Sequence, residues 1–273
     1  MARQPDGPPP PPVVQRLRVR YAKRDRLRFT SHRDFARAFE RALRRAELPM
    51  AYSAGFSPHP KVSYAGAAPT GVASEAEYLE IGLAERREPS VVREALDAAL
   101  PPGLDVLEVV EAAPPALADR IEASHWRIEL PGVTRAAVEQ SVDAFLALAE
   151  APVDKIMKDG PRRVDARGPV LSVCVSDSGV SEAEEPDTQD PCAILDLVVR
   201  HVTPTVRPDD VLTALRQAAA LTTPVTPRVT RLAQGLLGEM PPADAQQDGD
   251  GQQPALVPLR DPLRDVVAPA ATR

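Results

Sequence analysis

Two histidines and a row of arginines are the residues whose types and spacing could do chemistry in this chain. His32 is followed by Arg33, Arg37, Arg41 and Arg44, and His59 lies between two prolines. Imidazoles titrate near neutral pH, so a pair of them can serve as general base and acid on a phosphodiester. Arginine guanidinium groups bind phosphate oxygens. These residue types point to a polyanion such as RNA as the binding partner.

A helix that starts after Ser31 must position the arginines. Ser31 is predicted to cap it, with the Asp34 side chain reaching back to the Ser31 amide. Pro49 is predicted to end it. An apolar stripe recurs at helical spacing on the opposite face, at Phe35, Phe39, Leu43 and Ala46. An arginine face of this kind is also compatible with simple exposure to water.

The charge of the chain is unevenly distributed. The net charge is -6, yet residues 16–61 hold thirteen basic and four acidic side chains and carry +9. Such an asymmetry is typical of a polyanion-binding surface on an otherwise acidic protein. Residues 14–21 alternate apolar and basic side chains, which predicts a strand whose exposed face carries Arg16, Arg18 and Arg20.

The stretch after Pro49 contributes further candidate contacts. Pro58 and Pro60 restrict the backbone around His59, and Lys61 follows directly. Phe56 and Tyr64 could stack on unpaired bases. Each of these residues also has an ordinary structural interpretation, since aromatic side chains are common in cores and a histidine between prolines is common in turns.

The order of elements predicts an α+β fold of two tandem ferredoxin-like units. Residues 15–113 read strand, helix, strand, strand, helix, strand, which is the βαββαβ pattern, and residues 124–236 repeat it. The proline-rich arm 1–14, the acidic insert 176–190 and the tail 239–273 are predicted to be disordered. In the second unit, residues 155–167 are predicted to form a basic loop, with Lys158, Arg163 and Arg167 as additional contacts.

Composition narrows the class of protein. Cys174 and Cys192 are the only cysteines, so the chain can hold neither the three-cysteine cluster of a radical SAM enzyme nor a cysteine zinc site. We expect no metal and no cofactor. The sequence shows neither a signal peptide nor a membrane-length apolar run, and we expect a cytoplasmic protein that does not enter a membrane.

Several short strings resemble a known family. They are Phe29-Thr30-Ser31-His32, Gly55-Phe56-Ser57-Pro58-His59-Pro60-Lys61, Gly71-Val72-Ala73-Ser74-Glu75-Ala76-Glu77-Tyr78 and Val164-Asp165-Ala166-Arg167. Over residues 16–236 the chain resembles the radical-SAM-linked domain family of unknown function, which is also fused to the C-terminus of B12-binding-type radical SAM proteins. The resemblance implies a radical SAM enzyme as partner and proximity to RNA processing.

Three interpretations remain open. The first is a non-catalytic RNA-binding protein that delivers an RNA such as tRNA or rRNA to a radical SAM enzyme. The second is a metal-independent endoribonuclease that uses His32 and His59; this rests on a looser similarity to tandem ferredoxin-like CRISPR endoribonucleases, in which Lys61 or Tyr64 would stabilise charge. The third is a protein-interaction scaffold for the radical SAM partner. We expect the first.

Overall fold

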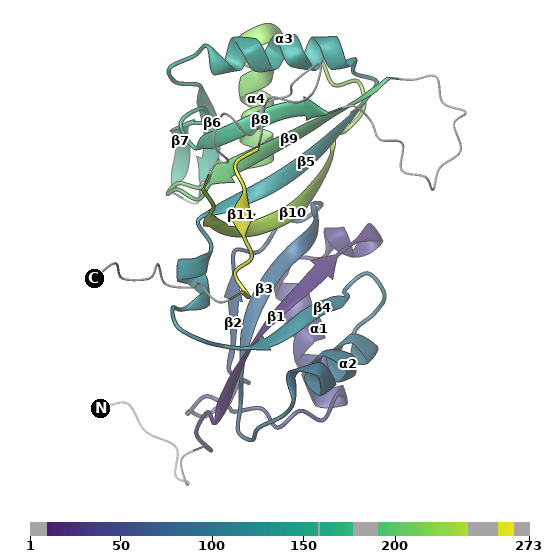
Figure 1. Ribbon diagram of the computed structural model, residues 1–273, viewed down its shortest axis with the longest axis vertical. Helices are drawn as coiled ribbons and strands as arrows, with labels where there is room; N and C mark the ends of the chain where they lie inside the picture. Colours follow the sequence, from purple (N-terminus) through teal and green to yellow (C-terminus); the bar gives the residue numbers. More distant parts are fainter. Residues whose placement is uncertain (1–9, 158, 177–190, 240–255, 265–273) are drawn as a thin grey trace. The chain divides into compact units, whose positions relative to one another are not determined.

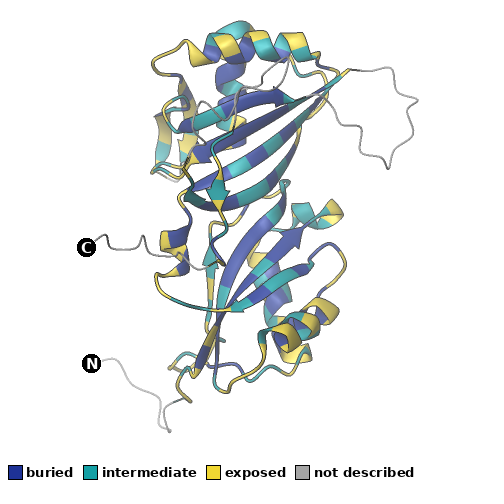
Figure 2. Cartoon of the chain, viewed as in Figure 1, coloured by how far each residue is buried: buried dark blue, intermediate teal, exposed yellow. Residues whose placement is uncertain are grey.

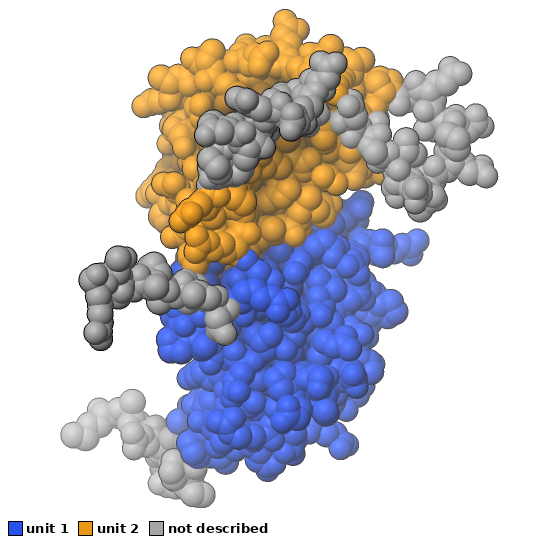
Figure 3. Space-filling view, in the orientation of Figure 1, with its two compact units in different colours: residues 1–120, 261–273 blue, residues 121–260 orange. Residues whose placement is uncertain are grey.

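The computed structural model describes residues 10–157, 159–176, 191–239 and 256–264, which form two compact units. Unit 1 comprises residues 1–120 and 261–273, and unit 2 comprises residues 121–260; Figure 3 colours them separately. The arm 1–9, nearly all of the insert and much of the tail lie outside the described residues. The α+β class expected from the sequence is confirmed.

Unit 1 is a four-stranded antiparallel sheet with two α-helices on one face (Figure 1). The strands lie in the order β4-β1-β3-β2. Its elements are β1 (Gln15–Lys23), the 3₁₀ helix η1 (Asp25–Phe29), α1 (His32–Arg45), β2 (Val62–Ala65), β3 (Ala73–Leu83), α2 (Pro89–Ala99), β4 (Val106–Glu111) and the 3₁₀ helix η2 (Leu117–Arg120).

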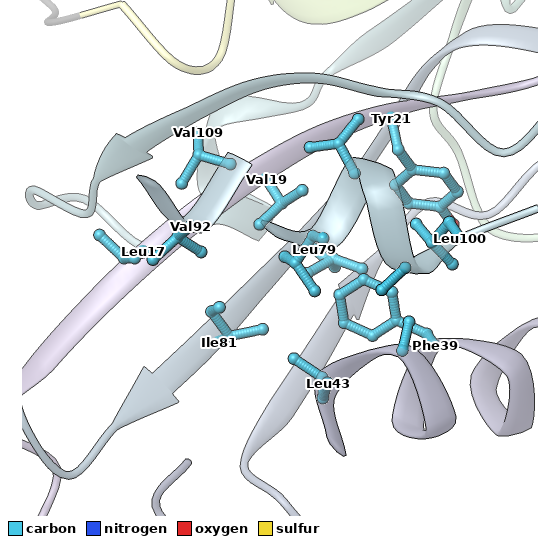
Figure 4. Packing of buried hydrophobic residues seen from close by; sticks show 14 of the residues in the cluster. Leu17, Val19, Tyr21, Phe39, Leu43, Leu79, Ile81, Val92, Leu100 and Val109 are labelled. Atoms are coloured by element: carbon cyan, nitrogen blue, oxygen red, sulfur yellow. The ribbon is translucent and has the colours of Figure 1, made fainter. Parts of the chain in front are cut away.

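The core of unit 1 lies between this sheet and its helices (Figure 4). Alternate residues of β1, namely Leu17, Val19 and Tyr21, point toward the helices because successive strand side chains face opposite ways. Phe39 of α1 and Leu79 of β3 are fully buried against them. Removing this apolar surface from water is the main force that holds α1 on the sheet.

Unit 2 places four strands in the order β10-β5-β9-β8, again antiparallel. Buried residues follow the centre of these strands in Figure 2. A separate two-stranded ribbon pairs β6 with β7. The elements are β5 (Ala123–Pro131), α3 (Arg135–Leu146), β6 (Pro152–Met157), β7 (Gly160–Asp165), β8 (Val170–Ser176), β9 (Cys192–Arg200), α4 (Pro208–Ala219), β10 (Arg228–Leu237) and β11 (Leu259–Arg260).

Most of the segment predicted to be a basic loop, residues 155–167, belongs to the paired strands β6 and β7, so that prediction is wrong. β6 and β7 pair from Pro152 with Asp165 to Met157 with Gly160. Gly160 has φ +112°, a conformation that glycine adopts without steric cost. Arg162 and Arg163, which suggested a loop, are exposed on β7, whereas Lys155 of β6 is mostly buried and pairs with Asp210.

The predicted tail also contains structure. Within it, β11 pairs with β10 through Leu236 and Leu237. A Cβ built on Gly235 would lie 1.8 Å from the carbonyl oxygen of Arg260, so only glycine permits this approach. Just beyond β11, Pro262 and Arg264 supply carbonyl oxygens to the buried Arg120 of unit 1. A proline-rich composition does not exclude pairing over two residues at a sheet edge.

None of the described helices is both long enough and apolar enough to cross a membrane.

Candidate nucleic-acid interface

Helix α1 begins and packs largely as its sequence predicts. The Ser31 hydroxyl oxygen accepts a hydrogen bond from the Asp34 amide at 3.2 Å. The Asp34 carboxylate accepts from the Ser31 hydroxyl at 2.7 Å, whereas the sequence predicted the Ser31 amide as donor. Phe35, Phe39 and Leu43 are buried, which confirms the apolar stripe. The opposite face of α1 is therefore fixed toward water.

That face carries Arg33, Arg37, Arg41 and Arg44, which we call the α1 arginine row. All four side chains are exposed. Among the described residues, none of the four has a hydrogen bond or an ion pair with a side chain of the protein. With 1.5 Å of rise per residue, the row is about 16 Å long. A row of free guanidinium groups of this length can contact several phosphates of one RNA strand.

The strand arginines are placed differently from one another. The prediction of an exposed arginine face on β1 holds for Arg16, whose side chain is 57% exposed, and is wrong for Arg18. Arg18 is 3% exposed. Its guanidinium bonds the carbonyl oxygen of Ala113 at 2.6 Å and lies 3.4 Å from Glu80, its partner across the ladder. Arg20 donates to the carbonyl oxygen of Glu75 at 2.9 Å. Both side chains are engaged within unit 1, and we leave Arg18 out of the proposed RNA surface.

The segment from Met50 to Lys61 projects as a loop from the end of β3. Lys61 N donates to the Ala51 carbonyl at 2.8 Å, and Gly82 N donates to the Lys61 carbonyl at 2.9 Å. Beyond this base, Ser53 and His59 bond each other through Ser53 N to His59 O at 2.8 Å and His59 N to Ser53 Oγ at 3.0 Å. The backbone of His59 is thus held, while its side chain is exposed.

Phe56 occupies the tip of this loop and is 71% exposed. Gly55 before it has φ +133°, and a Cβ built there would have no atom within 4 Å. Glycine is therefore favoured here by the backbone conformation of the bend and not by a lack of space for a side chain. An exposed phenylalanine on a fixed loop gains nothing for the fold of unit 1. It is available to stack on a base, as the sequence suggested.

Aromatic rings connect the start of α1 to β2. The rings of His32 and Tyr64 meet edge to face, with centroids 4.8 Å apart. Tyr64 also contacts Phe35 at 6.0 Å, and Phe35 stacks on Tyr21 at 4.4 Å. The structure therefore brings His32 together with Tyr64. It shows no contact between His32 and His59 among the described residues, so the two histidines proposed as an acid–base pair are not joined.

Burial, together with the negative charge of Glu40, raises the pKa of Tyr64 to about 12. At neutral pH the Tyr64 phenol is consequently protonated. It can donate a hydrogen bond to an oxyanion, but it cannot act as a base. This fits the charge-stabilising role considered for Tyr64 and excludes tyrosinate chemistry near pH 7.

The raised pKa of Tyr64 predicts a distinctive alkaline titration. In the folded protein the Tyr64 phenol should ionise near pH 12, whereas an unfolded chain ionises at the ordinary 10.0. The protonated phenol stabilises the fold fully below pH 10, and this contribution is lost as the pH rises through about 12. Subtracting the tyrosinate absorbance of Tyr64→Phe from that of the wild type isolates this group. If this difference in absorbance reached its full value near pH 10, Tyr64 would ionise like an exposed tyrosine, which would contradict the argument that burial raises its pKa.

The three RNA contacts predicted in unit 2 differ in how the structure places them. Lys158 lies outside the described residues. Arg163 is exposed on β7, 3.7 Å from an equally exposed Asp154. Arg167 is partly buried, and its guanidinium lies 5.7 Å from the centroid of the Phe145 ring. Of the predicted contacts in unit 2 that the structure describes, only Arg163 has a largely exposed side chain.

Asp165 organises the end of the β6–β7 ribbon. Its carboxylate accepts backbone N–H groups from Ala151 at 2.8 Å, Arg167 at 2.8 Å and Gly168 at 2.9 Å. Burial opposes ionisation, but these three hydrogen bonds outweigh it and lower the pKa of Asp165. The Val164-Asp165-Ala166-Arg167 string is thus a turn that fixes the chain before β8.

Sequence reasoning missed a polar cluster in unit 2. Asp196 lies in the middle of β9 and accepts hydrogen bonds from His125 and Arg127 of β5. The available signal was a single acid inside an otherwise apolar run, Ala193 to Val199. An aspartate at the centre of a buried strand requires partners, because an unpaired carboxylate there would not stay charged.

The fold and the surface define a class: an α+β protein of two sheet-and-helix units that presents a row of free arginines on its first helix. Comparison with family models identifies the group within that class. Residues 16–208 match the family described as "Uncharacterized protein conserved in bacteria (DUF2344)", and the chain belongs to this family. A search of curated proteins found no match.

Proposed function

We propose that this protein is a non-catalytic RNA-binding accessory protein, and that the α1 arginine row contacts the phosphates of the RNA. The observation that carries the proposal is that all four arginines of the row are exposed and have no acidic partner among the described residues. Holding four like charges on one helix face costs the protein repulsion. An anionic partner relieves that repulsion, and the phosphates of RNA are spaced along a chain as the arginines are along the helix.

The topology supports this proposal. In each unit the first and third strands are central and the fourth and second are at the edges, with neighbours antiparallel. We assign both units to the ferredoxin-like class on this order, with the β6–β7 ribbon as an addition to the second. Proteins that bind RNA commonly use this class of small sheet, although fold alone does not fix function.

The partner we propose is a radical SAM enzyme, to which this protein would deliver a structured RNA such as tRNA or rRNA. The proposal rests on the resemblance carried by the Gly55 to Lys61 string, which forms the exposed loop described above. Cys174 and Cys192 are both free thiols. They fit a reducing cytoplasm, where we place the protein.

A salt titration of RNA binding tests the proposal. Full-length protein is mixed with total small RNA, and affinity is measured as the salt concentration rises. We expect the logarithm of the binding constant to fall linearly with log salt, with a slope near -0.7 for each neutralised phosphate of a single strand. Weak binding that does not change with salt would overturn the proposal. Capture of a radical SAM enzyme in the absence of RNA binding would favour the scaffold function instead.

The contact between His32 and Tyr64 supports a second candidate, metal-independent RNA cleavage. In this candidate mechanism His32 takes the proton of the attacking 2′-hydroxyl and returns it to the leaving 5′-oxygen. The neutral Tyr64 phenol donates a hydrogen bond to the charged phosphate oxygen. End-labelled RNA incubated with the protein and a chelator would be cut by the wild type and left intact by His32→Ala, with RNA affinity unchanged. RNA that stays intact with both proteins removes this candidate.

A further inference from the structure

The polar cluster of unit 2 is built around one buried carboxylate. The Asp196 side chain is 4% exposed. Its Oδ1 lies 3.1 Å from His125 Nε2 and accepts Arg127 Nε at 3.1 Å. Its Oδ2 accepts a second Arg127 nitrogen at 3.2 Å and the Ser176 hydroxyl at 3.1 Å. Three side chains from two strands thus converge on Asp196.

The register of the sheet produces this convergence. Asp196 of β9 is directly opposite Arg127 of β5, and His125 is two residues along on the same face. Along β5 the alternate residues Trp126, Ile128 and Leu130 are buried on the other face. The His125 and Arg127 side chains remain 22% and 43% exposed. Solvent therefore reaches the cluster from the side of these two residues.

Charge and proton positions in the cluster follow from these contacts. Burial opposes ionisation of Asp196, but the hydrogen bonds and charges of His125 and Arg127 outweigh it and lower the pKa of Asp196. An ionised carboxylate only accepts hydrogen bonds, so His125 must carry its hydrogen on Nε2. His125 Nδ1 then faces away from Asp196. Arg127 likewise donates to Asp196 from Nε and Nη2, so its other terminal nitrogen, Nη1, does not contact Asp196.

Neither His125 Nδ1 nor Arg127 Nη1 has a partner among the described residues. The acids nearby do not supply one, because Asp196 is already occupied and Glu129 lies 3.6 Å from Arg228. Cys174, opposite Asp196 on β8, adds no negative charge, since burial and then the Asp196 carboxylate raise the pKa of its thiol. The cluster therefore presents two open nitrogens beside a neutralised aspartate.

A purely structural function does not explain this arrangement well. Replacing buried ionic groups by apolar side chains of similar volume is often neutral or stabilising, so such a network is weak evidence of stability alone. The carboxylate fixes the orientation of one arginine and one histidine while leaving their outward atoms free. Fixed orientation lowers the entropy cost of binding a ligand.

We propose that Arg127 and His125, oriented by Asp196, bind a phosphate group where their side chains reach solvent, on the face of the unit 2 sheet opposite Trp126. The Arg127 guanidinium would donate from Nη1 to one phosphate oxygen. His125 Nδ1 would accept the hydroxyl of hydrogen phosphate or, when protonated, donate to a second oxygen. The ligand is either free phosphate or the terminal phosphate of a nucleotide. The site is in unit 2 and does not depend on the α1 arginine row.

The test uses full-length protein and three probes: inorganic phosphate, a dinucleotide with a 5′-phosphate, and the same dinucleotide without it. Histidine ring signals followed by NMR report on His125, identified by their loss in His125→Gln. We expect a saturable shift of these signals with phosphate. Stronger binding of the phosphorylated dinucleotide than of phosphate identifies a nucleotide ligand, and equal binding identifies free phosphate.

Arg127→Gln and Arg228→Gln form a matched pair, because both remove one partly exposed arginine from the same sheet. We expect Arg127→Gln to weaken phosphate binding at least tenfold and Arg228→Gln to leave it unchanged. No saturable shift of His125 in the wild type overturns the proposal, even if Arg127→Gln fails to fold. Equal loss in both variants, or equal binding of the two dinucleotides, also overturns it.

Discussion

Replacing Arg37 and Arg41 together by glutamate is expected to reduce RNA affinity about a hundredfold at 0.1 M salt. Each phosphate contact contributes a slope of about 0.7 in log affinity against log salt, so two lost contacts remove about 1.4 from the slope and about 25-fold in affinity at 0.1 M. The two new carboxylates then repel the phosphates and account for the remainder. Fluorescence anisotropy with labelled RNA at several salt concentrations measures both quantities.

The matched control changes the same number of charges on other helices. Arg93 of α2 and Arg216 of α4 lie outside the α1 arginine row. Their double replacement by glutamate alters net charge equally and should change RNA affinity only a few-fold. If the two double variants lose affinity alike, binding reflects overall charge and the α1 surface is not the RNA site.

Phe39→Ala is expected to lower the free energy of unfolding by roughly 3–5 kcal/mol, the usual cost of removing a buried aromatic ring. Phe39 is 0% exposed, and its ring centroid lies 5.7 Å from that of Phe35. The loss combines the lost burial of the ring with the cavity left between α1 and the sheet. Urea unfolding followed by circular dichroism measures it as a lower transition midpoint.

Phe56→Ala serves as the comparison for Phe39→Ala. Because Phe56 is 71% exposed, its loss should change stability by no more than about 0.5 kcal/mol. A Phe39→Ala protein that unfolds within about 1 kcal/mol of the wild type would show that the core relaxes around the missing ring. The same Phe56 variant separates stability from RNA stacking, since only the second should decrease.

The first helix could be predicted from sequence because its determinants are local. Ser31 and Asp34 are three residues apart, and Phe35, Phe39 and Leu43 repeat every four residues. The face on which the arginines lie follows from that period alone. For the same reason the exposure of the α1 arginine row is as the sequence predicted.

The environment of the strand arginines could not be predicted in this way, because it depends on distant partners. Arg18 meets Glu80 and Ala113, which are 62 and 95 residues away along the chain. Alternation along β1 identifies which side chains share a face, but it does not show what covers that face. Asp196 and His125, separated by 71 residues, were missed for the same reason.

The position of residues 259–264 in the sequence has a consequence for folding during synthesis. Arg120 donates hydrogen bonds to the carbonyl oxygens of Pro262 and Arg264, and these two residues are synthesised 142 and 144 residues after it. Strand β10 likewise cannot pair with β11 until β11 has been synthesised. On the ribosome both units therefore stay incomplete until this short segment emerges. The buried guanidinium of Arg120 obtains these two acceptors only after the other strands that the structure describes have been synthesised.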